Sequence, residues 1–312
     1  MKSKFYIFTV FILFLFSACS APETVEPLEN SLPAGRMIVI GDITADPAEV
    51  IEGTQPLADY LAAKLVDYGI TGGQVRIVTS MEEMAELLKN GEVDIYFDSI
   101  YPATYISDMT GGQIVLRRWR FGVDEYHSVI FASKNSGITS LEDLRGQIFV
   151  MDAPYSTSGY MMPAAHLLEA GLTLSAKGNY TDPVNKNEVG FVFGYDDENV
   201  LQWVLSGRAE AGAVDNYRYD VAFPSEVTSN ELVVLARTDG VPRQVMVVRP
   251  GFDPALLETL KAVLINMDED ESAQAALKKF QTSQFDDFPE GITAAMQEIR
   301  RMFEMVREID LP

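Results

Sequence analysis

The stretch "SLEDLRGQIFVMDAPYSTSGYMMPAAHL" (residues 140–167) contains the signals for a short helix, a strand, a polar loop and a second helix. Ser140 and Asp143 have the spacing that caps a short helix. The apolar run at 147–152 predicts a buried strand, and apolar residues at helical spacing predict a helix over 160–171. A strand, a loop and a helix in this order are typical of an α/β sheet covered by helices.

The polar loop carries three hydroxyl side chains, Ser156, Thr157 and Ser158, followed by Gly159. The first turn of the helix after it has backbone N–H groups without partners, and the helix dipole places partial positive charge there. Hydroxyl donors beside these groups predict a site for a tetrahedral oxyanion, and the glycine lets the backbone come close to it. The alternative is a plain N-cap. A cap needs only one hydroxyl, so three in series favour binding.

The same order of elements recurs along the chain. Residues 36–98 predict alternating strands and helices of a parallel sheet, and residues 126–250 predict a second set. Each set contains a helix, a glycine turn and a strand that ends in aspartate, Asp98 before Ser99 in the first and Asp215 in the second. Two α/β lobes predict a cleft between them, with ligands at the carboxyl ends of the strands.

We expect lobe 1 to consist of residues 36–125 and 240–312, and lobe 2 of residues 126–239. The chain would then cross twice between the lobes. Bending at the two crossings would close the cleft on a ligand.

Residues 1–18 have the pattern of a signal segment, with an apolar run at 5–16 that is too short to span a bilayer. The run ends in "FSAC", which resembles a bacterial lipobox and contains Cys19, the only cysteine of the chain. A lone cysteine forms no disulfide within one molecule, so we expect acylation; the alternative is an ordinary cleaved signal. Residues 19–35 are rich in Pro, Glu and Ser and predict a disordered tether.

The composition and the motifs of the chain argue against several classes of function. The chain carries 24 basic and 46 acidic residues, for a formal net charge of −22. Such a surface repels nucleic acid and indicates solubility outside the cell, while a small anion can still bind because salt screens charges beyond about 8–10 Å. The sequence has no GxSxG elbow, no phosphate-binding GxxxxGK[ST] loop and no Cys/His metal set. We expect no catalytic residue, no cofactor and no metal.

Five stretches in order give the chain a family resemblance: "DYLAAKL", "GEVDIYF", "SGITSLEDLRGQIFVMDAPYSTSGYMMPAAHL", "GRAEAGAVD" and "VPRQVMVVRP". Over nearly all of residues 36–290 the chain resembles the phosphate/phosphonate-type substrate-binding proteins of ABC importers. The resemblance implies a bilobed periplasmic-binding-protein fold, type II-like, in which two α/β lobes enclose a ligand cleft. It also implies a small-molecule oxyanion as ligand, an ABC permease as partner, and a monomer.

The resemblance further implies which residues bind. The family's Ser-Thr-Ser-Gly loop, which holds the phosphonate or phosphate oxygens, matches residues 156–159. A strand-end acid of lobe 2 matches Asp215, and two family tyrosines match Tyr101 and Tyr126. Many members carry a histidine in the turn that reads "FGYDDENV" (193–200) here, and this chain has none in it.

That turn contains Asp196 and Asp197, for which the simpler explanation is that acids favour the first turn of a helix. The alternative is that Asp197 and Asp215, with Asp98, form a cation-binding corner opposite the hydroxyl loop. The loop itself brings no cationic side chain, so a ligand with an anionic head and an ammonium tail would satisfy both ends. A metal is a third option, but three contiguous acids do not have the spacing of a calcium loop.

We therefore expect an extracytoplasmic solute-binding lipoprotein of an ABC importer, anchored to the membrane through Cys19. Its expected ligand is an amino-bearing phosphonate or a related oxyanion. The alternative is a sensor that presents the same bound anion to a histidine kinase or chemoreceptor. The receptor sequence does not separate these two roles.

Overall fold

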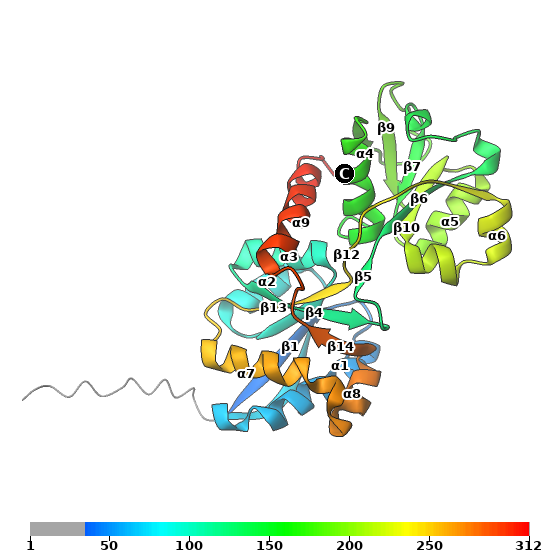
Figure 1. Ribbon diagram of the computed structural model, residues 1–312. Helices are drawn as coiled ribbons and strands as arrows, with labels where there is room; N and C mark the ends of the chain where they lie inside the picture. The colour runs from blue at the N-terminus through cyan, green and yellow to red at the C-terminus, as the bar shows by residue number, and fades with distance from the viewer. Residues whose placement is uncertain (1–34, 312) are drawn as a thin grey trace, which may run out of the picture.

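A computed structural model describes residues 35–311. The expected signal segment, Cys19 and nearly all of the expected tether lie outside these residues. Two six-stranded sheets, each covered by helices, form two lobes (Figure 1). The expected α/β fold of two lobes is confirmed.

The sheet of lobe 1 has the strand order β14-β4-β13-β3-β1-β2. Its strands are β1 (Arg36–Ile43), β2 (Ile70–Val78), β3 (Ile95–Asp98), β4 (Gln113–Arg120), β13 (Gln244–Val248) and β14 (Thr282–Asp286). The helices that accompany it are α1 (Pro47–Lys64), α2 (Met81–Asn90), α3 (Ile100–Thr110), α7 (Pro254–Ile265) and α8 (Gln274–Lys279).

The sheet of lobe 2 has the order β11-β6-β10-β7-β9-β8. Its strands are β6 (Ser128–Ser133), β7 (Ile148–Met151), β8 (Leu174–Ala176), β9 (Val189–Phe193), β10 (Ala211–Asp215) and β11 (Leu232–Arg237). Its helices are α4 (Met162–Glu169), α5 (Asp197–Ser206) and α6 (Ser225–Asn230). Strands β7, β9 and β10 are buried along their whole length, because helices cover both faces of the sheet.

The sheets are mixed, whereas the sequence pattern predicted parallel ones. Strands β1, β2 and β3 are parallel, but β13 lies between β3 and β4 and is antiparallel to both. In lobe 2, β6 is likewise antiparallel to its neighbours β10 and β11. Strands β13 and β6 are the ones that enter a lobe directly from the other lobe. No crossover helix turns the chain around before them, so they run in the opposite direction.

The two crossings of the chain pair with each other. Strands β5 (Glu125–Tyr126) and β12 (Val241–Pro242) form a two-stranded antiparallel ribbon between the lobes. Tyr126 and Val241 face each other in this ribbon and are both buried. The ribbon therefore places Tyr126, and the residues after Val241, at the junction of the lobes.

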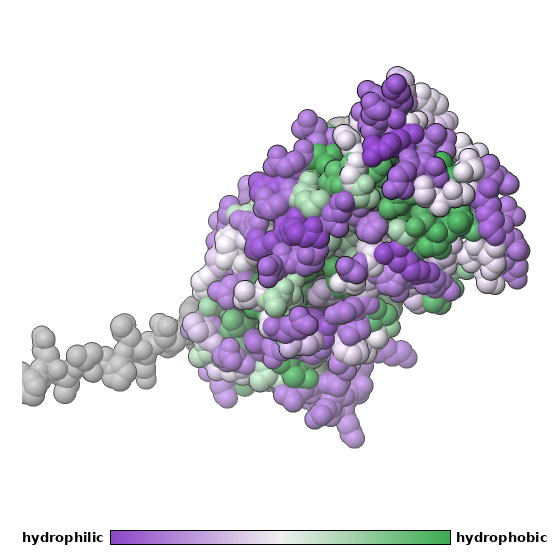
Figure 2. Space-filling model, turned by 45° about the horizontal axis from the view of Figure 1, so that its top comes forward, coloured by the Kyte–Doolittle hydropathy of each residue, from purple (hydrophilic) through white to green (hydrophobic). Residues whose placement is uncertain are grey.

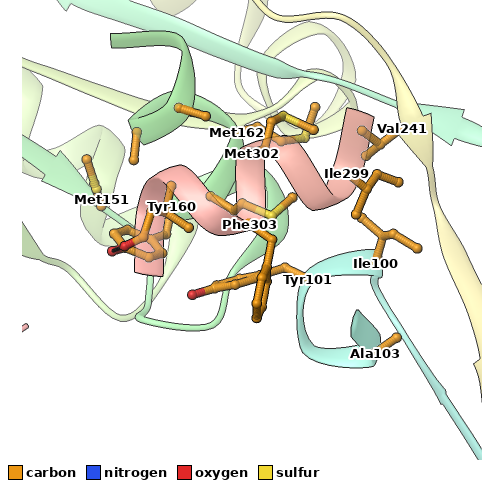
Figure 3. Packing of buried hydrophobic residues seen from close by; sticks show 14 of the residues in the cluster. Ile100, Tyr101, Ala103, Met151, Tyr160, Met162, Val241, Ile299, Met302 and Phe303 are labelled. Atoms are coloured by element: carbon orange, nitrogen blue, oxygen red, sulfur yellow. Dashed lines mark hydrogen bonds between the residues drawn. The ribbon is translucent and has the colours of Figure 1, made fainter. Parts of the chain in front are cut away.

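The last helix, α9 (Ile292–Arg307), contacts both lobes. Its buried face joins a hydrophobic cluster that includes Tyr101 of lobe 1 and Tyr160 of lobe 2 (Figure 3). Neighbouring arginines of the helix pair with opposite lobes. Arg300 pairs with Asp108 of α3 at 2.8 Å, and Arg301 pairs with Glu169 of α4. The helix thus bridges the lobes on the outside of the hydroxyl loop.

Hydrophilic residues cover most of the molecular face in Figure 2, which fits the acidic composition. Within residues 35–311, no helix combines the length and the apolar character that crossing a bilayer requires.

Candidate ligand-binding site

A cavity of about 460 Å³ lies where the two lobes meet. Lobe 1 and the connecting ribbon contribute Asp98, Ser99, Arg120, Tyr126, Arg243 and Gln244, and lobe 2 contributes residues 152–158, Tyr195, Asp197 and Asp215. The structure therefore brings together most of the residues that the sequence singled out. Two of them, Tyr101 and Gly159, are not among its lining residues.

The three hydroxyls of the loop have different partners. Ser156 caps the following helix, since its Oγ accepts a hydrogen bond from the backbone N–H of Gly159 at 3.0 Å. Thr157 joins the lobes, since its Oγ1 accepts from the backbone N–H of Tyr101 at 3.0 Å. The hydroxyls of Thr157 and Ser158 are within hydrogen-bonding reach of the phenol of Tyr126. Only the hydroxyl of Ser156 caps the helix. Thr157 and Ser158 line the cavity without a capping role.

The helix after the loop begins with a π-helical turn at Thr157–Met161 before α4. A second π-helical turn, Arg218–Ala222, follows the end of β10, close behind Asp215. Such wide turns are rare and occur often at functional sites. The first turn contains the cavity-lining Thr157 and Ser158, and the second begins three residues after the cavity-lining Asp215.

Gly159 has a structural role that differs from the expected one. A Cβ atom at this position would lie 2.3 Å from the Cβ of Asp152, so the loop can pack against Asp152 only with a glycine here. The sequence pattern predicted that this glycine lets a ligand approach the backbone closely. The structure instead explains it by the packing of the loop on its own strand.

Tyr101 is buried in the aromatic cluster behind the loop rather than in the cavity. Its ring centre lies 5.7 Å from that of Phe303 of α9 and 6.1 Å from that of Tyr160 (Figure 3). Burial raises the pKa of its phenol to about 12. Its contribution to the site is the backbone N–H that holds Thr157.

Two arginines that were not predicted from the sequence line the cavity. Arg120 lies at the end of β4, and Arg243 follows directly after β12. The guanidinium of Arg243 lies 4.4 Å from the ring centre of Tyr126. The Nε of Arg120 is buried and has no hydrogen-bond partner among the described residues. Burial and the charge of Arg243 lower the pKa of Arg120. The cations that the loop lacks therefore come from the opposite lobe.

The two explanations for the "DDE" run, a helix cap and a wall of the cavity, each apply to one of its acids. Asp196 caps α5, with its Oδ1 accepting from the backbone N–H of Glu198 at 2.9 Å. Asp197 lines the cavity and pairs with Arg218 at 3.0 Å. Burial, followed by the charges of Asp152 and Asp215, raises the pKa of Asp197 to about 7. The simpler explanation fits Asp196, and Asp197 belongs to the wall of the cavity.

Asp215 and Asp98 hold corresponding places in the two lobes. Asp215, only 9% exposed, ends β10 and accepts a hydrogen bond from the backbone N–H of Arg218 at 2.9 Å. Asp98 ends β3 and accepts from the hydroxyl of Tyr96 and from the backbone N–H of Ser99, the latter at 2.6 Å. Burial raises the pKa of Asp98. Carboxylates thus face the cavity from both lobes.

Neither histidine lines the cavity. The ring Nε2 of His127 lies 3.1 Å from a guanidinium nitrogen of Arg237, and His166 is on α4. No group of three or more His, Cys, Asp or Glu side chains within residues 35–311 could hold a metal ion.

Residues 43–289 match the family model of the periplasmic substrate-binding proteins of phosphonate ABC transporters. The chain belongs to this family. It is a periplasmic substrate-binding protein of a phosphonate ABC transporter, not an enzyme, and the family implies transporter components as partners. The resemblance found in the sequence is thereby confirmed.

Solved structures of similar proteins share the fold of this chain. The Xanthomonas citri protein XAC2383, bound to chloride, is 29% identical with a TM-score of 0.80. The same protein bound to ATP gives 28% and 0.78. PhnD1 of Prochlorococcus marinus, in complex with methylphosphonate, is 18% identical with a TM-score of 0.60 and shares the fold. Each match covers 87% of this chain and 98% of the other.

Because Ser156 caps a helix, replacing it should lower the stability of the protein more than replacing its neighbours. We expect Ser156→Ala to lower the free energy of unfolding by about 1 kcal/mol, because the N–H of Gly159 loses its acceptor. Ser158→Ala, the matched control, should change it by no more than about 0.5 kcal/mol. Urea denaturation of the two variants measures the difference. Equal losses would show that the cap is not specific to Ser156.

The environment of Asp197 makes stability depend on pH. Its pKa is about 7 in the folded protein against an ordinary value of 3.8, so wild type loses stability as the pH rises from about 4 to about 7. We expect Asp197→Asn to be more stable than wild type at about pH 8, by on the order of 1 kcal/mol, with the difference vanishing near pH 4.

Denaturation of Asp197→Asn and wild type at several pH values tests this expectation. Asp196→Asn is the control, because asparagine also caps helices and Asp196 is exposed. A lower stability of Asp197→Asn at about pH 8 would mean that the ion pair with Arg218 outweighs the cost of burial.

Proposed function

We propose that the cleft binds an amino-bearing phosphonate, with the oxyanion head between the hydroxyl loop of lobe 2 and the two arginines of lobe 1. The observation that carries this proposal is the buried Nε of Arg120, which has no partner among residues 35–311 and belongs to a side chain that lines the cavity. A buried N–H without an acceptor is costly, and a phosphonate oxygen supplies an acceptor.

The head has donors from both lobes. Ser158 and Thr157 cluster around Tyr126 from lobe 2, and the guanidinium of Arg243 lies against the ring of Tyr126 from the other side. Hydrogen bonds to a charged group contribute about 1.5–3 kcal/mol each. A tetrahedral head that contacts both walls would hold the lobes together.

The ammonium group of the ligand is assigned to the carboxylates of lobe 2. Asp197 and Asp215 line the same cavity as the hydroxyl loop, and the charge of Asp215 adds to burial in raising the pKa values of Asp197 and Asp152. Arg218 offsets the charge of Asp197 only in part, since the pKa of Asp197 remains raised. A cation from the ligand would relieve the repulsion that remains.

The ligands of similar proteins support an anion site. Chloride and ATP, which are bound in the two structures of the Xanthomonas protein, are both anions. The present chain differs in sequence from that protein at most positions. The choice of an amino-bearing phosphonate rests on the acids of this chain.

Calorimetric titration at one pH and salt concentration tests the proposal. We expect 2-aminoethylphosphonate to bind at least about tenfold tighter than inorganic phosphate, which corresponds to about 1.4 kcal/mol. Asp215→Asn should remove most of this preference, because an asparagine Oδ1 can still accept the N–H of Arg218 but carries no charge. Phosphate that binds wild type as tightly as the amino compound does would contradict the proposal.

We also propose that Cys19 carries the lipid that anchors the protein. The support is sequence alone: the apolar run, the "FSAC" ending and the single cysteine. Cys19→Ser should move the protein from the membrane fraction to the soluble fraction while ligand affinity stays unchanged. Mass analysis of the mature N-terminus measures the modification directly, and an unmodified start at another residue would rule it out.

A further inference from the structure

A second cavity, of about 470 Å³, opens from the ligand cleft into lobe 1. We call it the lobe 1 compartment. The two cavities share three lining residues, Asp98, Arg120 and Gln244. The other lining residues include Asp42, Thr44, Val50, Thr54, Arg118 and Gln281. Arg120 therefore stands at the junction of the two spaces.

The compartment does not depend on the angle between the lobes. Its walls come from β1, α1, β3, β4, β13 and the segment around α8, all of which belong to lobe 1. Hinge closure moves one lobe against the other but leaves each lobe's interior unchanged. The volume is roughly fifteen times the about 30 Å³ of one water molecule, which is enough for a short polar chain.

Most charged groups around the compartment are already paired. Arg118 is buried and donates to the Oγ1 of Thr282 and the Oε1 of Gln244, each at 2.7 Å. Lys279 pairs with Glu52 at 2.5 Å. The donors of Arg118 are therefore used within the wall, while Lys279 and Glu52 form an exposed ion pair.

Arg120 and Asp42, which are both half-buried, differ from these paired groups; Glu49 also forms no ion pair among the described residues, but it is exposed. The Nε of Arg120 has no partner among the described residues. Asp42, at the carboxyl end of β1, forms no ion pair within residues 35–311 and receives only a backbone hydrogen bond, from Ile43. Burial and the charge of Asp98 raise the pKa of Asp42 to about 6. Among the described residues, the lining of the compartment thus includes an acceptor without an ion pair, Asp42, and a buried donor without a hydrogen-bond partner, the Nε of Arg120.

We infer that the natural ligand has polar arms on both sides of its phosphorus atom, as a phosphodiester or a phosphonate monoester does, and that the arm in the lobe 1 compartment carries hydroxyl groups. This inference rests on the proposed function for the position of the head. With the head at Arg120, one arm reaches the acids of lobe 2 and the other reaches Asp42. A free phosphonate has a single substituent and would fill only one of these spaces.

Hydroxyl groups suit the second arm because of what lines the compartment. Asp42 and Gln281 present acceptors, and Thr44 and Thr54 present hydroxyls that donate and accept. An ammonium group on this arm is the other chemistry that an acid such as Asp42 accommodates. The experiment below separates the two.

Calorimetry with four probes tests the inference on the full protein. 2-Aminoethylphosphonate carries only the amino arm, and glycerol 3-phosphate carries only the hydroxyl arm. Glycerophosphoethanolamine carries both, and bis(2-aminoethyl) phosphate carries two amino arms. We expect glycerophosphoethanolamine to bind at least about tenfold tighter than either one-armed probe and tighter than the diamino diester.

Two variants of the compartment assign that gain to lobe 1. Val50→Trp fills the compartment from α1, and Asp42→Asn removes its unpaired charge. We expect Val50→Trp to abolish the tenfold gain of glycerophosphoethanolamine, and Asp42→Asn to reduce it severalfold, while 2-aminoethylphosphonate keeps its wild-type affinity within about threefold. Val66→Trp is the control, because Val66 is 59% exposed and lines neither cavity.

The outcomes separate this inference from the proposed function. If 2-aminoethylphosphonate binds and glycerophosphoethanolamine binds no tighter, the second arm is wrong and the head site stands. A tighter diamino diester would overturn the hydroxyl assignment. If none of the probes binds, the proposed function itself fails. Thermal melting checks that Val50→Trp folds, and if it does not, Asp42→Asn decides.

Discussion

The ligand-binding site depends on a row of charged and polar side chains across one edge of the lobe 1 sheet. Arg118 and Arg120 lie at the end of β4, Gln244 at the start of β13, Asp98 at the end of β3 and Asp42 at the end of β1. Burying charges costs free energy unless each finds a partner. Arg118 finds its partners within the lobe, whereas the Nε of Arg120 has none among residues 35–311.

The opposite lobe complements this row. Lobe 2 brings hydroxyls at a helix start and the carboxylates of Asp152, Asp197 and Asp215. Burial, followed by the charges of Asp152 and Asp215, raises the pKa of Asp197. Lobe 1 supplies the guanidinium groups and Asp98, and lobe 2 supplies the hydroxyls and the larger set of acids. The zwitterionic ligand proposed above would contact both lobes.

Contacts behind the cleft connect the site to the outer structure. Thr157 accepts the N–H of Tyr101 across the lobe boundary, and the ring of Tyr101 packs on Phe303 of α9. The same helix pairs with α3 and α4 through neighbouring arginines. The position of the hydroxyl loop relative to lobe 1 is therefore coupled to the packing of α9, which begins beyond the residues that match the family model.

The sequence by itself determined the features that depend on neighbouring residues. The two α/β lobes followed from alternating periodicities, and the hydroxyl loop and Asp215 followed from strand ends and helix starts. Local patterns did not reveal the antiparallel insertion of β13, because strand direction depends on how the chain returns from the other lobe. Local patterns also could not show that Asp196 caps α5 while Asp197 pairs with Arg218. The two acids are adjacent, and a shift of one position would exchange their roles. Arg120 and Arg243 resembled ordinary strand residues. Only the tertiary structure decided that they share a cavity with Ser158, because segments far apart in the chain meet there and the low-dielectric junction makes their charges matter.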